Sequence, residues 1–152
     1  MAELLAEVRA SQVRTDAMDQ AAADYLGINR TDYRALDVLD QKGRLTAGEL
    51  AREMHLTTGA VTSVLDRLER AGYARRVRDP DDRRRVLVEI SPEVARACEH
   101  IYGRPEDAFR AFAGYTEAEL EVLLRFMRDG RRWQEERLAA LASLPKPNPA
   151  RG

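Results

Sequence analysis

The sequence is poor in the residues that build metal sites and disulfide scaffolds. Its 152 residues include one cysteine, Cys98, and two histidines, His55 and His100, which lie far apart in the chain. A single cysteine cannot form an internal disulfide or a structural zinc site. We therefore predict no metal and no cofactor, and the reducing cytoplasm is the expected compartment.

Long apolar runs are also missing. No stretch approaches the roughly 18 to 20 apolar residues that cross a bilayer, so no membrane partner is predicted. The first residues, from Met1 to Glu7, are acidic and lack a basic region followed by an apolar one, so no secretory signal is expected. Aromatic residues make up only 6% of the chain, whereas 44% is hydrophobic and 34% is charged. This balance indicates a folded, charge-rich and largely helical domain.

The net charge is close to zero, but the charges are unevenly distributed. There are 25 basic and 26 acidic residues, which gives a formal charge of −1. Residues 1–40 carry a net charge of −4, whereas residues 67–86 contain eight arginines against four acids, a net charge of +4. A short basic segment of this kind is a candidate surface for a polyanion such as DNA.

Helical periodicity precedes this basic segment. A first helix is expected to run to about Tyr25, and its face is only moderately apolar, which suits pairing with another helix better than a deep core. That face consists of Leu4, Val8, Ser11, Thr15, Met18, Ala22 and Tyr25. After Gly27 we expect a second helix, with Thr31 as its N-cap and Gly43 near its end.

The next two helices are short and close together. Thr46 and Glu49 have the spacing of a capping box, which predicts a short helix directly after Thr46. After a turn at residues 55–56, Thr57 can cap a further helix that runs to about Ala71. Its predicted buried stripe is Val61, Val64, Leu65 and Leu68. This order indicates a helix-turn-helix.

The periodicity then changes from helix to strand. Residues 73–78 and 84–90 are predicted to be two strands, and the turn cluster at 79–82 joins them into a hairpin. The hairpin is rich in arginine: Arg75, Arg76, Arg78, Arg83, Arg84 and Arg85. A hairpin that directly follows a helix-turn-helix is typical of a wing.

The remaining residues predict helices separated by a break. Ser91 and Pro92 suit the N-cap and the first position of a helix. The run 103–105 interrupts the helical pattern, and Thr116 and Glu119 form a second capping box that begins a long helix. We interpret the aromatic residues here as a dimer core, with the lining of a ligand pocket as the alternative: Tyr102, Phe109, Phe112, Tyr115 and Trp133.

Together these elements predict a mainly α fold with a small β-hairpin, of the α+β class. Residues 28–91 form a winged helix-turn-helix lobe that binds double-stranded DNA. Long helices within residues 1–27 and 92–143 flank this lobe. The Pro-rich segment 144–152 is a flexible tail.

The candidate DNA contacts lie on the second helix of the helix-turn-helix and at the tip of the hairpin. The helix face opposite the apolar stripe is small and polar, which lets a helix enter the major groove. On this helix the candidates are Thr57, Thr58, Gly59, Thr62, Ser63 and Arg67; on the hairpin they are Arg83, Arg84 and Arg85. Arginine suits the narrow minor groove. Asp82 can brace Arg84 across the turn, and Asp66 is expected to pair with a neighbouring arginine.

These residues also have plainer interpretations. The threonines can serve as helix caps and surface residues, and an arginine run can be a solvated face. For Thr57 a cap and a DNA contact can coexist. Cys98 is predicted to be a small, buried hydrophobe instead of a redox sensor.

Residues 45–51, the helix 57–72 and the wing 79–88 together resemble the MarR family of bacterial transcription regulators. The run of Asp82, Arg83 and Arg84 after an Asp-Pro turn is the most specific element, and the resemblance covers residues 28–92. It implies a homodimer in which residues 1–27 and 92–143 form the dimerisation helices. The dimer would bind a pseudopalindromic operator, with recognition helices in the major groove and wings in the minor groove. It also implies a repressor that a small aromatic or lipophilic effector releases. By the same resemblance, Asp82 and Arg84 occupy the wing-bracing and minor-groove positions.

The sequence departs from the family pattern at two places. Val94 stands where the family commonly has glycine, and the break at 103–105 interrupts the arm that would dimerise. The peroxide-sensing branch of the family needs a reactive cysteine in the first helix, and residues 1–25 contain none.

Two other classes of function compete with a DNA-binding regulator. A winged-helix interaction module would bind an acidic protein partner through the arginine hairpin and would not bind DNA. An enzyme would need a catalytic cluster, and the sequence contains no P-loop, no dinucleotide-binding glycine motif and no Ser/His/Asp arrangement. No enzymatic activity is predicted.

Overall fold

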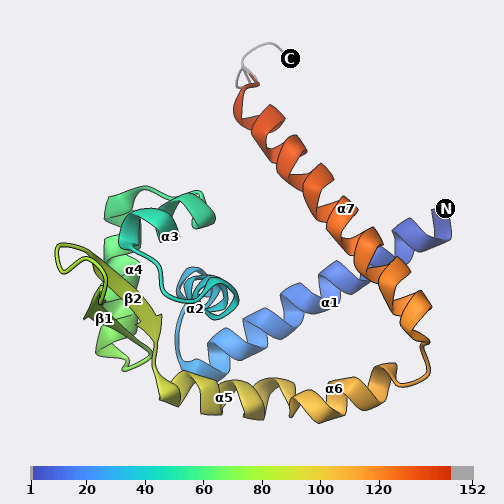
Figure 1. Ribbon diagram of the computed structural model, residues 1–152, viewed down its shortest axis with the longest axis horizontal. Coiled ribbons are helices and arrows are strands. Elements are labelled where there is room, and N and C mark those ends of the chain that lie inside the picture. Colours follow the sequence, from blue (N-terminus) through green and yellow to red (C-terminus); the bar gives the residue numbers. More distant parts are fainter. Residues whose placement is uncertain (1, 145–152) are drawn as a thin grey trace. The chain divides into compact units, whose positions relative to one another are not determined.

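The computed structural model describes residues 2–144. The chain divides into two compact units, the first ending at Arg104 and the second beginning at Pro105 (Figure 1). The tail predicted from residue 144 lies, from Pro145 onward, outside the described residues.

Four helices begin the first unit. They are α1 (Ala2–Leu26), α2 (Arg30–Lys42), α3 (Ala47–Met54) and α4 (Thr58–Arg70). The predicted N-cap of α2 was wrong by two residues, because Asn29 takes the role expected of Thr31. Asn29 has an extended backbone, and its side-chain oxygen accepts the Asp32 N–H at 2.9 Å. Both residue types cap helices well, so the sequence alone did not separate them.

The helix-turn-helix forms where the sequence predicts it. Thr46 and Glu49 make the expected capping box at the start of α3. Thr57 caps α4 by accepting the Ala60 N–H at 3.2 Å. Between the two helices, His55 adopts the left-handed conformation (φ 54°), which ends α3 and lets the chain turn toward α4.

The wing is an antiparallel pair of strands, β1 (Ala74–Arg78) and β2 (Val86–Ile90). Arg76 faces Val88 at the middle of the register, and Leu45 adds an isolated bridge to Val88 from the loop before α3. The second strand was predicted to begin two residues earlier, at Arg84. It begins later because the N–H groups of Arg84 and Arg85 bond to Asp82 within the turn.

The core of the first unit lies between α2, α3, α4 and the hairpin, and the C-terminal end of α1 and the start of α5 complete it. All four residues of the predicted α4 stripe are buried, which confirms the helical periodicity. The buried side chains of the two central helices are Leu50, Ala51, Met54, Val61, Val64, Leu65 and Leu68. Burial of large apolar side chains contributes about 1.5–3 kcal/mol each, so this cluster is the main source of the unit's stability.

Helix α5 (Pro92–Tyr102) begins as predicted, with Ser91 in the extended N-cap conformation and Pro92 as its first residue. The Ser91 side chain makes no capping hydrogen bond to a backbone N–H of the helix. Its hydroxyl instead donates to the carbonyl of Gly72 at 2.7 Å, across the loop that leaves α4. Gly72 has φ +75°, a conformation that favours glycine. The serine therefore ties the two ends of the wing together.

The second unit contains α6 (Pro105–Phe112) and α7 (Glu117–Ala142). The predicted break at 103–105 and the capping box of Thr116 and Glu119 are both confirmed. No residue of α7 is buried. Along α1, likewise, only Ala22, Ala23 and Leu26 are buried, so most of the moderately apolar face predicted from Leu4 onward lies outside the core.

No helix of the described residues is long and apolar enough to span a membrane.

Candidate nucleic-acid interface

The outer face of α4 is small and polar in the structure, as the sequence predicted. Thr57, Thr58, Gly59, Thr62 and Ser63 are all exposed. A Cβ added at Gly59 would meet no atom within 4 Å, so the surface at this point is open. The hydroxyls of Thr62 and Ser63 donate to carbonyl oxygens one turn earlier, and their oxygen atoms can still accept further hydrogen bonds.

Arg67, the last α4 candidate, has a partner inside the protein. Its Nε donates to one carboxylate oxygen of Asp32 at 2.8 Å, and a terminal nitrogen donates to the other at 2.6 Å. Asp32 lies in the first turn of α2, and its side chain is only 2% exposed. No local pattern in the sequence predicts this pair, because 35 residues separate Arg67 from Asp32.

The wing tip presents its arginines to solvent. The side chain of Arg84 is 92% exposed, and its Nε lies 3.2 Å from Asp82, which confirms the predicted brace. The Arg84 backbone N–H also donates to Asp82 at 3.0 Å. Hydrogen bonds from that N–H and then from the Arg84 side chain lower the pKa of Asp82, so it stays ionised. Arg83 is exposed beside them.

Arg85, the third wing candidate, lies in the turn of the wing, directly before β2. One terminal nitrogen contacts Glu49 at 3.2 Å and the other contacts the buried Asp79 at 3.5 Å. The other oxygen of Glu49 accepts the Thr46 N–H of the α3 capping box at 2.7 Å. Arg85 therefore links the wing to the start of α3.

Most of the other wing arginines are also paired. Arg76 contacts Asp66 and Glu69 of α4, which confirms the pairing expected for Asp66. Arg75 pairs with Glu89 on the neighbouring strand. Arg78, at the end of β1, is exposed and makes no ion pair with the described residues, so it joins the candidate surface. The sequence predicts that Arg78 lies in the hairpin, but it does not single out Arg78 as a DNA contact.

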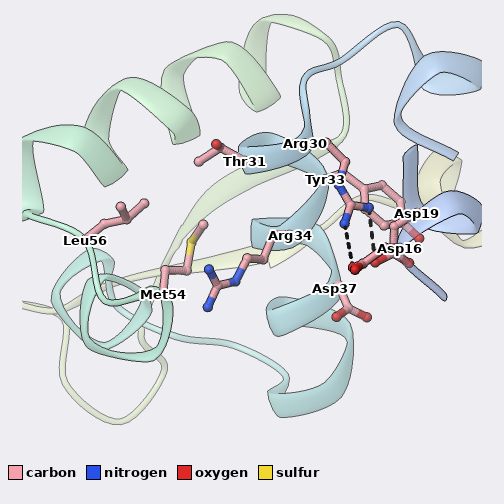
Figure 2. Close-up of a pocket in the computed structure, with 9 residues that line it drawn as sticks. All are labelled: Asp16, Asp19, Arg30, Thr31, Tyr33, Arg34, Asp37, Met54 and Leu56. Atoms are coloured by element: carbon pink, nitrogen blue, oxygen red, sulfur yellow. Dashed lines mark hydrogen bonds and ion pairs between the residues drawn. The ribbon is translucent and has the colours of Figure 1, made fainter. Parts of the chain in front are cut away.

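A cavity of about 510 Å³ lies between α1, α2 and the end of α3. Figure 2 shows Arg30 in ion pairs with Asp16 and Asp19 at its rim. Met54 and Leu56 supply apolar surface from the helix-turn-helix. The full lining is Asp16, Asp19, Arg30, Thr31, Tyr33, Arg34, Asp37, Met54 and Leu56. The sequence offered a pocket lining as the alternative role of five aromatic residues, and none of the five lines this cavity.

Tyr33 also contacts the far end of α5. Its hydroxyl forms a hydrogen bond with the hydroxyl of Tyr102, the last residue before Gly103. Burial, followed by this hydrogen bond, raises the pKa of Tyr33 well above its usual value.

Cys98 packs against the same core and is partly buried. Burial raises the pKa of its thiol, with smaller contributions from Asp40 and Asp37. A thiol of raised pKa is a weak nucleophile at neutral pH, which agrees with the packing role predicted for it. Among residues 2–144, no group of three His, Cys, Asp or Glu side chains is placed to hold a metal ion.

The short helix α3, the left-handed turn, the open face of α4 and the arginine-tipped hairpin define a winged helix-turn-helix protein. The MarR family model matches residues 28–86. The HTH-type transcriptional regulator YcgE of Bacillus subtilis (strain 168) is 40% identical over 130 residues, which covers 84% of each chain. This chain belongs to the MarR family of DNA-binding transcriptional regulators, a family of regulators and not of enzymes.

Solved structures share the fold over most of the chain. A MarR family protein from Bacillus stearothermophilus has a TM-score of 0.63 and 26% identity, with 88% of this chain and 94% of that one covered. FabT from Streptococcus pneumoniae, solved in complex with DNA, has a TM-score of 0.59 and 23% identity, covering 90% of this chain and 99% of its own. At that identity the likeness to FabT concerns the fold alone.

Proposed function

We propose that this protein is a homodimeric repressor that binds a pseudopalindromic operator and acts in the cytoplasm. The observation that carries the proposal is the exposed guanidinium of Arg84, which Asp82 braces at the tip of a wing that follows an open, polar recognition helix. Arginine held in this way suits the narrow minor groove, and a small polar helix face suits the major groove. FabT, which shares the fold, was solved with DNA.

A second copy of the chain accounts for the exposed apolar side chains of α6 and α7. Phe109 is 75% exposed and Trp133 62%, fractions that a monomer seldom leaves in contact with water. A homodimer with twofold symmetry would place its two recognition helices in successive major grooves, about 34 to 36 Å apart.

The repressor would respond to a small aromatic or lipophilic effector. The cavity described above supports this part of the proposal, since Met54 and Leu56 belong to the helix-turn-helix while Asp16 and Asp19 belong to α1. An effector that prefers one arrangement of these elements would lower DNA affinity by that preference alone.

The test is a fluorescence anisotropy titration against the DNA upstream of the protein's own gene, at two salt concentrations, with random duplex as competitor. We expect binding that resists the competitor and falls steeply with salt. We predict that Arg84→Ala weakens binding by about 1–3 kcal/mol, the usual value of one groove contact, with the fold intact. Arg96→Ala, which removes an exposed arginine of α5, is the matched control.

Equal binding by Arg84→Ala and Arg96→Ala would remove the wing from the mechanism. Weak, competitor-sensitive binding of every upstream fragment by the unmodified protein would contradict operator recognition and favour a protein partner for the hairpin.

A further inference from the structure

We propose that Asp32 and Arg67 form an orienting clamp for the recognition helix, so that Arg67 serves DNA binding by holding α4 in place and not by contacting DNA. This inference rests on the proposed function, because it concerns how α4 is presented to an operator. It assigns a positioning role to two residues, one of which the sequence had suggested as a DNA contact.

The geometry of the pair is specific. Two nitrogens of the Arg67 guanidinium meet the two oxygens of one carboxylate at 2.8 Å and 2.6 Å. This two-bond arrangement restricts the orientation of both side chains, whereas a single bond would leave the guanidinium free to rotate. The clamp joins the first turn of α2 to the last turns of α4.

The acidic partner is buried and further restrained. The Asp32 side chain is 2% exposed, and the Asn29 amide donates to it at 2.9 Å. The Asp32 backbone N–H in turn bonds to the Asn29 side chain. Swinging Arg67 out to a phosphate would leave this buried carboxylate without its counter-ion, which is strongly unfavourable.

The place of Arg67 on α4 explains why the clamp matters for DNA. Gly59, Ser63 and Arg67 follow one another at intervals of four residues, so they lie on one face of the helix. Given a helix radius of about 5 to 6 Å, a rotation of about 20° would move the outer side chains by about 2 Å. A shift of that size exceeds the tolerance of a hydrogen bond to a base edge.

The clamp and a direct contact predict opposite results for one substitution. Asp32→Asn keeps the shape of the side chain and an acceptor oxygen, but it removes the charge that holds Arg67. If Arg67 contacts DNA, freeing it leaves operator affinity unchanged or raises it. If Arg67 positions α4, operator affinity falls, by about tenfold or 1.4 kcal/mol.

The experiment measures the full-length protein and the variants Asp32→Asn, Arg67→Gln and the double variant on operator and on random duplex, at several salt concentrations. Arg70→Gln on the same helix and the exposed Asp24→Asn are the matched controls. We expect both single variants to lose about tenfold in operator affinity, with binding to random duplex and the salt slope unchanged. The double variant should lose no more than either single variant, because both break the same pair.

Hydrogen exchange over α4, measured without DNA, gives a readout that does not need an operator. We expect its amides to exchange several-fold faster in Asp32→Asn and in Arg67→Gln than in either control, at a temperature where every variant is folded. This measurement separates the two proposals: absence of operator binding by the unmodified protein contradicts the proposed function, whereas unchanged exchange over α4 contradicts the clamp.

Two further results would overturn the clamp. The first is operator affinity that is kept or raised in Asp32→Asn while Arg67→Gln reduces the salt slope by about one, the signature of a lost phosphate contact. The second is a lower melting temperature in both variants with operator affinity of the folded protein unchanged, which would leave the pair with a purely structural role.

Discussion

Helices α4 and α7 are both amphipathic, but their apolar sides differ in burial. The four apolar residues of the α4 stripe are completely or almost completely buried, whereas no residue of α7 is. The large side chains that α7 exposes are Leu120, Val122, Leu123, Leu124, Phe126, Met127, Trp133, Leu138 and Leu141. The winged lobe therefore has a core of its own, whereas α7 presents the apolar surface that the second copy of the proposed homodimer would cover.

Removing apolar surface from α4 gives the largest expected effect on folding. Leu65 is fully buried, so Leu65→Ala should lower the free energy of unfolding by about 2–5 kcal/mol. Urea denaturation followed by circular dichroism measures this loss. A loss below about 1 kcal/mol would mean that the lobe core tolerates a cavity and that the contrast with α7 is weaker than the burial indicates.

The matching change in α7 should leave the lobe folded and act on association. Leu124→Glu places a charge on the exposed apolar face, so we expect the dimer dissociation constant to rise at least tenfold, with the lobe's unfolding transition unchanged. Sedimentation equilibrium measures the association, and Glu121→Gln on the same helix is the control. A variant that remains dimeric would place the interface elsewhere.

The capping boxes of α3 and α7 allow the lobe and α7 to be compared by a Thr→Ala substitution in each. Thr46→Ala removes the cap of α3, inside the lobe, and should cost about 0.5–2 kcal/mol of lobe stability. Thr116→Ala removes the cap of α7 and should lower helix content or association without moving the lobe's transition. Thermal unfolding of both variants, monitored in the near and far ultraviolet, separates the two results.

Acid should weaken both capping boxes. Hydrogen bonds from Thr46 and Thr116 lower the pKa of Glu49 and Glu119 below the usual value of 4.5. A carboxylate with a lowered folded-state pKa stabilises the fold above its unfolded pKa, and that contribution is lost as the pH falls below it. The unmodified protein should therefore lose stability as the pH falls below the usual carboxyl pKa of 4.5. Thr46→Ala should show a shallower loss over the same range.

Gly59→Ala gives the smallest expected change in stability and tests the function of the α4 surface. A Cβ at this position meets nothing in the protein, so alanine should stabilise the helix by about 0.5–1 kcal/mol. Operator affinity should nevertheless fall, because the added methyl group separates the helix from the groove. Unchanged affinity in the more stable variant would show that DNA does not approach this part of α4.

Local patterns predicted most of the fold, because local physics determines those features. The stripe of α4 follows from a period of 3.6 residues, and the boxes at Thr46 and Thr116 follow from side chains three residues apart. The N-cap of α2 was missed because Asn29 and Thr31 are both suitable. The start of β2 was missed because hydrogen bonds to Asp82 extend the turn.

The sequence predicted the type of candidate site, but it did not predict which arginines of the site pair with carboxylates inside the protein. Asp82 lies two residues before Arg84 in the same turn, so that brace could be predicted from the turn alone. Arg67 and Arg85 pair with Asp32 and Glu49, which are 35 and 36 residues distant. A single sequence contains no local signal for such pairs, and it therefore placed Arg67 and Arg85 among the DNA contacts together with Arg84.

The shared carboxylate of Glu49 has a consequence for protein engineering. One oxygen accepts the Thr46 N–H at the start of α3, and the other pairs with Arg85 in the turn of the wing. A chimera that exchanges only the wing with a relative would break this link unless residue 49 and its new partner are exchanged together. Helix α3 and the wing should therefore be exchanged together. A chimera whose junction lies between α3 and the wing would lose the contact between Glu49 and Arg85.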